Sequence, residues 1–300
     1  MPLLIPQGGI PMEPIRLIAM DMDGTLLTRT DPLTACIPPE NEEMLRRCAD
    51  AGIHLAFASG RMPDDAGFFA LDTGLPAHII GLNGSVILDH AAGEPVEARF
   101  LPPSIARGVL DILTARGIET AVFGAWEVTA MQEKPLSWAQ LALGSGFGRE
   151  GGRLVYHSGG LHADRLLECA GKIVAFGGDR IEELAQAKAQ INAEFPELSI
   201  SSSWWDNFEV NAAGVDKGSA LAMLADRLKI PMSQVMAIGD NGNDVPMLRA
   251  AGIGVAMGNA TADALAAADY VTLPHDAFGV AAAIRALVFG EAVSGVRPAH

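Results

Sequence analysis

The sequence predicts an α/β protein in which a doubly wound, Rossmann-like parallel sheet carries an inserted α+β domain. Short apolar runs alternate with helical periodicity at both ends of the chain, the pattern of a parallel sheet covered by helices. The runs at 54–59, 235–239 and 253–257 are almost continuously apolar, as strands buried on both faces must be. Between the two ends, paired strands and long helices interrupt the alternation, which predicts the insertion.

The elements of the first part follow in order. "IRLIAM" at 15–20, "IHLAFASG" at 53–60 and "AHIIGLNG" at 77–84 are predicted strands. "PPENEEMLRRCADAG" between the first two is predicted to be a helix, because prolines and acids stand at its start and Gly52 at its end.

The second part repeats the pattern. Helices are expected at 214–230, 243–252, 261–268 and 278–290, and strands at 234–240, 253–258 and 270–273. The insertion contains predicted helices at 102–117 and 180–196 and strands at 120–130, 172–178 and 198–210.

These elements divide the chain into expected units. Residues 15–89 and 206–290 are expected to form a core and 90–205 an inserted α/β domain, with an N-terminal extension at 1–14 and a frayed tail at 291–300. The junctions are expected near 89–93 and 206–211.

Composition excludes several classes of protein. The 36 acidic residues against 21 basic ones give a net charge of −15, which argues against nucleic-acid and anionic-membrane partners. No apolar stretch is long enough to span a membrane. The three cysteines show no metal-binding spacing, so we expect neither a zinc site nor a disulfide framework, and a cytoplasmic location. Both a monomer and a homodimer are compatible with these features.

Two carboxylates follow the first strand, in "IRLIAMDMDGTLL". Two anions about 4 Å apart repel by roughly 4 kcal/mol at an effective dielectric near 20, so Asp21 and Asp23 need a cation or a shared proton. Ser59 and Asp240 follow two other predicted strands, and Lys217 opens a helix. Because ligands bind beyond the carboxyl ends of parallel strands, we expect these groups to converge at one edge.

Their chemistry fits phosphoryl transfer. Asp21 can attack phosphorus and form an aspartyl-phosphate, and Asp23 can act as the acid and base. Lys217 and a Mg²⁺ ion held by Asp21 and Asp240 would offset the charge of the phosphate dianion. Ser59 can donate to a phosphoryl oxygen, and Gly24 and Thr25 offer backbone N–H groups at a tight turn.

The motifs "DMDGTLL", "ASGR", "DKGSAL" and "GDNGNDVPML", in this order, resemble those of the haloacid-dehalogenase-like (HAD) phosphatases. The long insertion, "GLNGSVI" and "AMGNA" resemble the Cof-type subfamily with its type IIB cap. The resemblance spans roughly residues 15–290.

The resemblance implies roles for single residues. The implied metal ligands are Asp21, Asp23 through its backbone carbonyl, and Asp240; phosphate is bound by Ser59, Gly60, Lys217 and Asn243; Asp244 supports the metal waters or Lys217.

The expected protein is a Mg²⁺-dependent phosphatase that acts on small phosphorylated metabolites. Sugar phosphates are the substrate class expected before any other. A phosphotransferase or mutase on the same core, and a catalytically idle binding protein, are the alternatives. Arg61 is assigned either to phosphate or to the surface, and Asn83 either to the substrate or to a turn.

Overall fold

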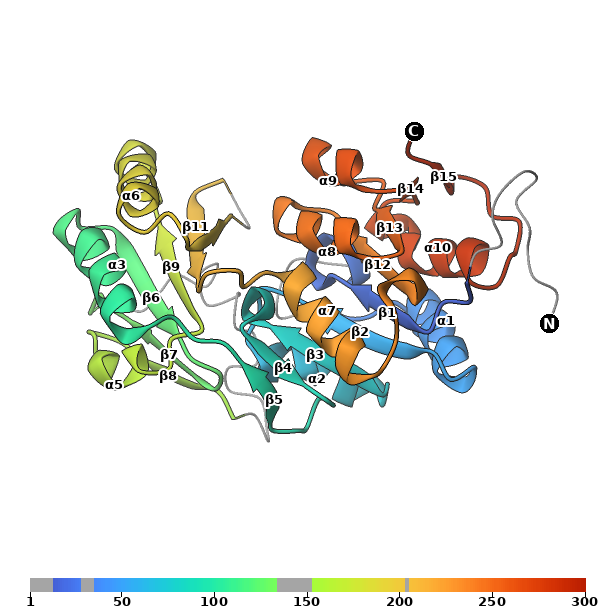
Figure 1. Ribbon diagram of the computed structural model, residues 1–300, viewed down its shortest axis with the longest axis horizontal. Coiled ribbons are helices and arrows are strands. Elements are labelled where there is room, and N and C mark those ends of the chain that lie inside the picture. Colours follow the sequence, from blue (N-terminus) through green and yellow to red (C-terminus); the bar gives the residue numbers. More distant parts are fainter. Residues whose placement is uncertain (1–12, 28–34, 134–152, 203–204) are drawn as a thin grey trace.

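The structure is a computed structural model that describes residues 13–27, 35–133, 153–202 and 205–300. Figure 1 shows two parts side by side, each built around its own β-sheet. The larger part combines both ends of the chain, and the smaller part is the segment inserted between them. Within the described residues no helix is both long enough and apolar enough to cross a membrane.

The core sheet has nine strands in the order β15-β14-β13-β12-β1-β2-β3-β4-β5. The six from β14 to β3 run parallel, whereas β4, β5 and β15 join antiparallel at the two edges. The strands are β1 (Leu17–Met20), β2 (His54–Ala58), β3 (Ala77–Gly81), β4 (Val86–Leu88), β5 (Pro95–Ala98), β12 (Val235–Gly239), β13 (Ile253–Ala256), β14 (Tyr270–Val271) and β15 (Arg297–Pro298).

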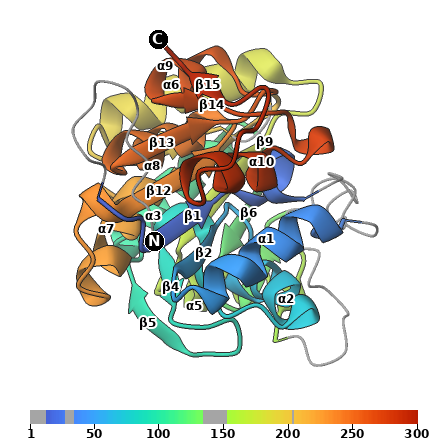
Figure 2. The same cartoon turned by 90° about the vertical axis from the view of Figure 1, so that its right-hand side faces the viewer.

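Helices cover both faces of this sheet, as Figure 2 shows. Ile18 and Met20 of β1 belong to one apolar cluster, together with α1, α2 and α10, while Leu17 and Ala19 belong to another, with α7, α8 and α9. Alternate side chains of a strand point to opposite faces, so a strand buried on both sides must be apolar at every position. The helices are α1 (Pro39–Asp50), α2 (Pro63–Thr73), α7 (Lys217–Arg227), α8 (Val245–Ala250), α9 (Ala262–Ala267) and α10 (Gly279–Leu287).

The cap has a six-stranded sheet in the order β10-β11-β9-β6-β7-β8. Its helices α3, α5 and α6 lie on the outer side, away from the core (Figure 1). The cap strands are β6 (Glu119–Phe123), β7 (Glu127–Ala130), β8 (Val155–His157), β9 (Lys172–Phe176), β10 (Ser199–Ser201) and β11 (Asn207–Asn211). The cap helices are α3 (Pro103–Ala115), α5 (Ala163–Leu167) and α6 (Ile181–Glu194).

The junctions between the two sheets lie further along the chain than the sequence suggested. β5, which falls after the expected boundary at residue 89, pairs with β4 in the core sheet. β11, which falls after the expected boundary at residue 205, pairs with β9 in the cap sheet. The connections between the sheets therefore run from Ala98 to Pro103 and from Asn211 to Lys217. Both shifts arise because the sheet to which a strand belongs is decided by its pairing partner, which local composition does not report.

The prediction of a frayed C-terminal tail is wrong. Arg297 and Pro298 pair antiparallel with β14, and the backbone N–H of Ala299 donates to the carbonyl of Asp269 at 2.9 Å. The proline stands on an edge strand, where a missing N–H is tolerated. The tail therefore covers the exposed edge of β14.

Candidate active site

Asp21 stands at the carboxyl end of the central strand β1. Its backbone N–H donates to the carbonyl of Ile238 in β12, and its side chain is almost buried. The chain then makes a tight turn in which Gly24 has φ +80°. A Cβ at Gly24 would lie 2.6 Å from a carboxylate oxygen of Asp240. Only glycine therefore allows the turn after Asp21 to approach Asp240 this closely.

Lys217 brings its ammonium group directly to Asp21. The side chain of Asp216 accepts the backbone N–H of Ser219, which caps helix α7 and fixes Lys217 in its first turn. The Lys217 Nζ lies 2.5 Å from Oδ1 of Asp21 and 2.6 Å from Oδ1 of Asp244, and its side chain is fully buried. Burial alone would lower the pKa of Lys217, but the two carboxylates outweigh burial and raise it. Lys217 is therefore a fixed positive charge.

Asp240 and Asp244 complete an acidic group around Asp21. Thr25 donates its hydroxyl to Oδ1 of Asp240 at 2.9 Å. Burial and the neighbouring Asp244 raise the pKa of Asp240 to about 7, although the bond from Thr25 opposes this. Burial and Asp244 likewise raise the pKa of Asp21 well above its usual value, against the pull of Lys217. The site therefore holds more negative charge than its lysine neutralises.

The donor set fits a hard divalent cation. Carboxylate oxygens of Asp21, Asp240 and Asp244 all lie within 4.8 Å of one another. Asp244 already binds Lys217 through Oδ1, and its Oδ2 accepts the backbone N–H groups of Asp240 and Asn241, each at 2.9 Å. Asp21 and Asp240 thus have carboxylate oxygens better placed to hold a cation, while Asp244 supports Lys217, and the assignment of the metal ligands stays a prediction. Oxygen ligands of this kind suit Mg²⁺.

The Asp23 carboxylate is held by the guanidinium of Arg61, a partner that the sequence did not indicate. Arg61 donates Nε to Oδ2 and Nη2 to Oδ1 of Asp23, at 2.7 and 2.6 Å, and Nη1 to the buried Asp65 at 2.7 Å. The Arg61 side chain is only 3% exposed, whereas that of Asp23 is 39% exposed. The surface alternative for Arg61 is therefore wrong, and two carboxylates, those of Asp23 and Asp65, are among its partners. A bidentate pair fixes the plane of the Asp23 carboxylate.

Ser59 and Gly60 lie beside these groups, because β2 is the parallel neighbour of β1. The Ser59 side chain is buried, and its Oγ accepts the backbone N–H of Arg61 at 3.2 Å. Asn243 donates to Oδ1 of Asn83 at 3.3 Å, so Asn83 turns toward the site and joins two of its loops. The contact between Asn243 and phosphate stays a prediction.

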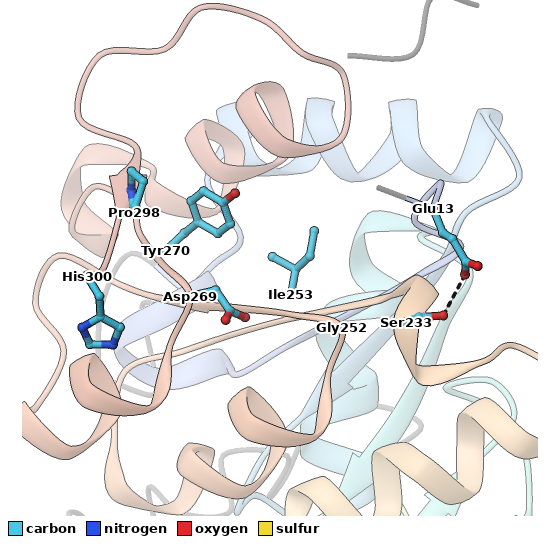
Figure 3. Close-up of a pocket in the computed structure, with 8 residues that line it drawn as sticks. All are labelled: Glu13, Ser233, Gly252, Ile253, Asp269, Tyr270, Pro298 and His300. Atoms are coloured by element: carbon cyan, nitrogen blue, oxygen red, sulfur yellow. Dashed lines mark hydrogen bonds between the residues drawn. The ribbon is translucent and has the colours of Figure 1, made fainter. Parts of the chain in front are cut away.

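A separate hollow lies at the opposite edge of the sheet (Figure 3). It is lined by residues at or before the starts of β12, β13 and β14, among them Ser233, Ile253 and Tyr270. The starts of parallel strands lie away from their carboxyl ends. This hollow therefore contains none of the groups described above.

Comparisons with known proteins agree with this geometry. Residues 18–284 match the family model of the haloacid dehalogenase-like hydrolases. The chain is 31% identical to phosphatase YwpJ of Bacillus subtilis over 286 residues, which cover 89% of this chain and 98% of the relative. The chain belongs to the haloacid-dehalogenase-like hydrolases. The family inferred from the four motifs is thus confirmed, and with it the phosphatase class of enzyme.

Two further relatives bear on this HAD phosphatase. It is 31% identical to the 5-amino-6-(5-phospho-D-ribitylamino)uracil phosphatase YcsE of Bacillus subtilis, over 90% of this chain and 95% of the relative. A solved HAD subclass IIB sugar phosphatase has the same fold, with a TM-score of 0.74 at 22% identity, over 90% of this chain and 98% of that one. The predicted α/β core with an inserted cap is confirmed.

Proposed function

We propose that this HAD phosphatase hydrolyses phosphate monoesters of small metabolites, sugar phosphates first, through a phosphoryl group carried on Asp21. The observation that carries the proposal is the buried ammonium of Lys217 between Asp21 and Asp244. A purely structural role would not need a lysine buried against a surplus of carboxylates at the carboxyl edge of a sheet, where ligands bind. That surplus fits a site built to receive a cation and a phosphate.

The first half of the reaction uses Asp21 as the nucleophile. Lys217 fixes Oδ1 of Asp21, and Oδ2 attacks phosphorus while the ester P–O bond breaks. Ser59 and Lys217 bind the phosphoryl oxygens, and the departing oxygen takes a proton from Asp23. Arg61 fixes the plane of the Asp23 carboxyl group and so sets the direction in which Asp23 gives up its proton.

The second half returns the enzyme to its first state. Asp23, now ionised, accepts a proton from a water molecule that attacks the phosphoryl group on Asp21, and the P–O bond to Asp21 breaks. The ionised form is the one that Arg61 stabilises with two hydrogen bonds. Asp21, Asp240 and the backbone carbonyl of Asp23 would hold Mg²⁺, which would supply positive charge for the phosphate dianion.

The substrate class rests on the cap and on one relative. A phosphate site at a sheet edge contacts few atoms of a metabolite, so a second surface must distinguish sugars. The cap can supply that surface, because its Lys172 contacts Gly60 in the proposed phosphate-binding loop, residues 59–61. The relative YcsE is named for its action on a phosphorylated ribityl compound, which is a polyol phosphate.

The test is phosphate release from a panel of phosphorylated sugars, polyols, nucleotides and amino acids, ranked by kcat/KM with Mg²⁺ and with EDTA. We expect Mg²⁺-dependent release, highest for a sugar or polyol phosphate. Release from no member of the panel would overturn the proposal. Transfer of the phosphoryl group to an added sugar, in place of water, would favour a phosphotransferase.

A further inference from the structure

The cap places two buried charged side chains on the side of its sheet that faces the core. On β9, Ile173 and Ala175 pack with the cap helices, while Val174 and Phe176 belong to the core-side cluster. Lys172 has the same parity as Val174, so its side chain also points toward the core. On β11, Glu209 alternates in the same way with Phe208 and Val210.

These two side chains form an ion pair within reach of the phosphate-binding loop. The Lys172 Nζ lies 3.2 Å from Oε2 of Glu209, and both side chains are essentially unexposed. Burial lowers the pKa of Lys172, and Glu209 opposes that shift. Asn83 of the core donates to the same Glu209 oxygen. A buried pair of this kind is a poor source of stability compared with apolar packing, so its presence calls for another role.

The Lys172 ammonium also donates to the carbonyl of Gly60, at 2.7 Å. This bond belongs to a set of three. The carbonyl of Ser59 accepts the N–H of Asn83 at 3.0 Å, and the carbonyl of Arg61 accepts the N–H of Leu82 at 2.8 Å. The outer carbonyls of the loop are thus held by the core, while the middle one is held by the cap.

The peptide between Gly60 and Arg61 affects the orientation of the Ser59 hydroxyl. The Gly60 carbonyl and the Arg61 N–H belong to one planar trans peptide, so they point in opposite directions. That Arg61 N–H donates to Oγ of Ser59 at 3.2 Å. Since Oγ accepts from the Arg61 N–H, its own proton points away from that donor and is free to be given to another acceptor. A donor on the Gly60 carbonyl therefore sets the direction of the Ser59 hydroxyl.

Gly60 leaves little space for a side chain at this contact. A Cβ at Gly60 would lie 3.0 Å from Oδ1 of Asn83 and 3.7 Å from Nζ of Lys172. The Lys172–Glu209 pair of the cap and the 59–61 loop of the core therefore meet directly at Gly60.

We infer that Lys172 is a positioning residue through which the docked cap orders the Ser59–Arg61 loop for binding the phosphoryl group. Glu209 neutralises the lysine and, through Asn83, ties it to the loop that contacts Asn243. Phosphate affinity then depends on cap docking, because an undocked cap withdraws the donor from Gly60. Product phosphate would be held tightly when the cap is docked and weakly when it is not. The inference rests on the proposed phosphoryl-binding role of Ser59.

The test measures inorganic phosphate as a competitive inhibitor of aryl phosphate hydrolysis. Lys172→Met would remove the ammonium that lies against the buried Glu209 carboxylate, so the main variant is the neutral pair Lys172→Met/Glu209→Gln, combined or not with Ser59→Ala. Lys188→Met, another lysine of the cap, is the matched control. Loss of a hydrogen bond from a charged donor predicts that the inhibition constant of phosphate rises about tenfold in the neutral pair. Lys188→Met should leave it unchanged.

The double-mutant cycle identifies the route. If Lys172 acts through Ser59, the neutral pair has little further effect once Ser59 is alanine. An equal effect in both backgrounds would overturn the inference while leaving the role of Ser59 intact. A Ser59→Ala variant that binds phosphate normally would overturn both. A neutral pair that only lowers the melting temperature, or only changes KM for sugar phosphates, would show a structural or a substrate-contacting lysine instead.

Discussion

Changing the pH should change the affinity for Mg²⁺ through Asp240. Its pKa is raised to about 7 by burial and by Asp244, so the carboxylate is largely protonated below that pH and ionised above it. A cation must displace this proton before it can bind. From pH 6 to pH 8 the ionised fraction rises from about a tenth to about nine-tenths, which predicts an increase of about tenfold in apparent Mg²⁺ affinity. Asp21, whose pKa is raised in the same direction, strengthens the trend.

The same shift predicts how stability depends on pH. Because the pKa of Asp240 is higher in the folded state than the ordinary value of 3.8, the Mg²⁺-free folded protein binds more protons than the unfolded chain between these values. The contribution of Asp240 to the free energy of unfolding is therefore fully present at low pH, and it falls as the pH rises toward about 7. Mg²⁺ binds the ionised form, so the increase in melting temperature that it causes should be larger at pH 8 than at pH 6.

Calorimetric titration and thermal melts, with and without Mg²⁺, measure both effects. Titration in buffers of different ionisation enthalpy gives the number of protons released. Asp240→Asn should remove the Mg²⁺ response, whereas Asp50→Asn, at an exposed position of α1, should retain it. Equal Mg²⁺ affinity at the two pH values, with no proton released, would refute the reasoning.

Three substitutions test single contacts. Asp21→Asn should abolish turnover without lowering the melting temperature, because the amide cannot carry the phosphoryl group; turnover within tenfold of wild type would contradict this. Lys217→Met should lower the free energy of unfolding by about 3–5 kcal/mol in urea titrations, because Asp21 and Asp244 lose their shared counter-ion; an unchanged midpoint would argue against the buried pair. Arg61→Lys should slow alkyl phosphates by up to about 10²-fold and activated aryl phosphates less, because Asp23 loses its bidentate partner; equal losses would exclude an effect on the acid.

The sequence predicted the core well because its signals are local. The apolar runs of β1, β2 and β12 are followed at once by Asp21, Ser59 and Asp240, and the parallel order brings these strand ends to one edge. Lys217 was equally visible, since Asp216 and Ser219 form a recognisable helix start.

Two contacts that the structure adds to the site were not predicted. Arg61 meets Asp23 across 38 residues, and Lys172 meets Gly60 across 112. Neither pair follows from spacing, because the first depends on how the loops after β1 and β2 meet and the second on how the cap packs on the core. One local signal was overlooked: Glu209 alternates with apolar residues in β11, which is the mark of a strand with one polar face. The paired tail at Arg297–Pro298 has no comparable signal, since two residues of edge pairing carry no periodicity.

The most direct test of the central claim is to trap the phosphoryl group on the enzyme. The protein is mixed with a sugar phosphate and Mg²⁺, quenched in acid within the first turnover, treated with borohydride to reduce any acyl-phosphate, and digested for mass spectrometry. The account predicts that reduction modifies residue 21 and leaves residue 23 as aspartate, and that the signal disappears in Asp21→Asn. Turnover with no modified residue 21 at any quench time, or modification of Asp23 instead, would contradict it.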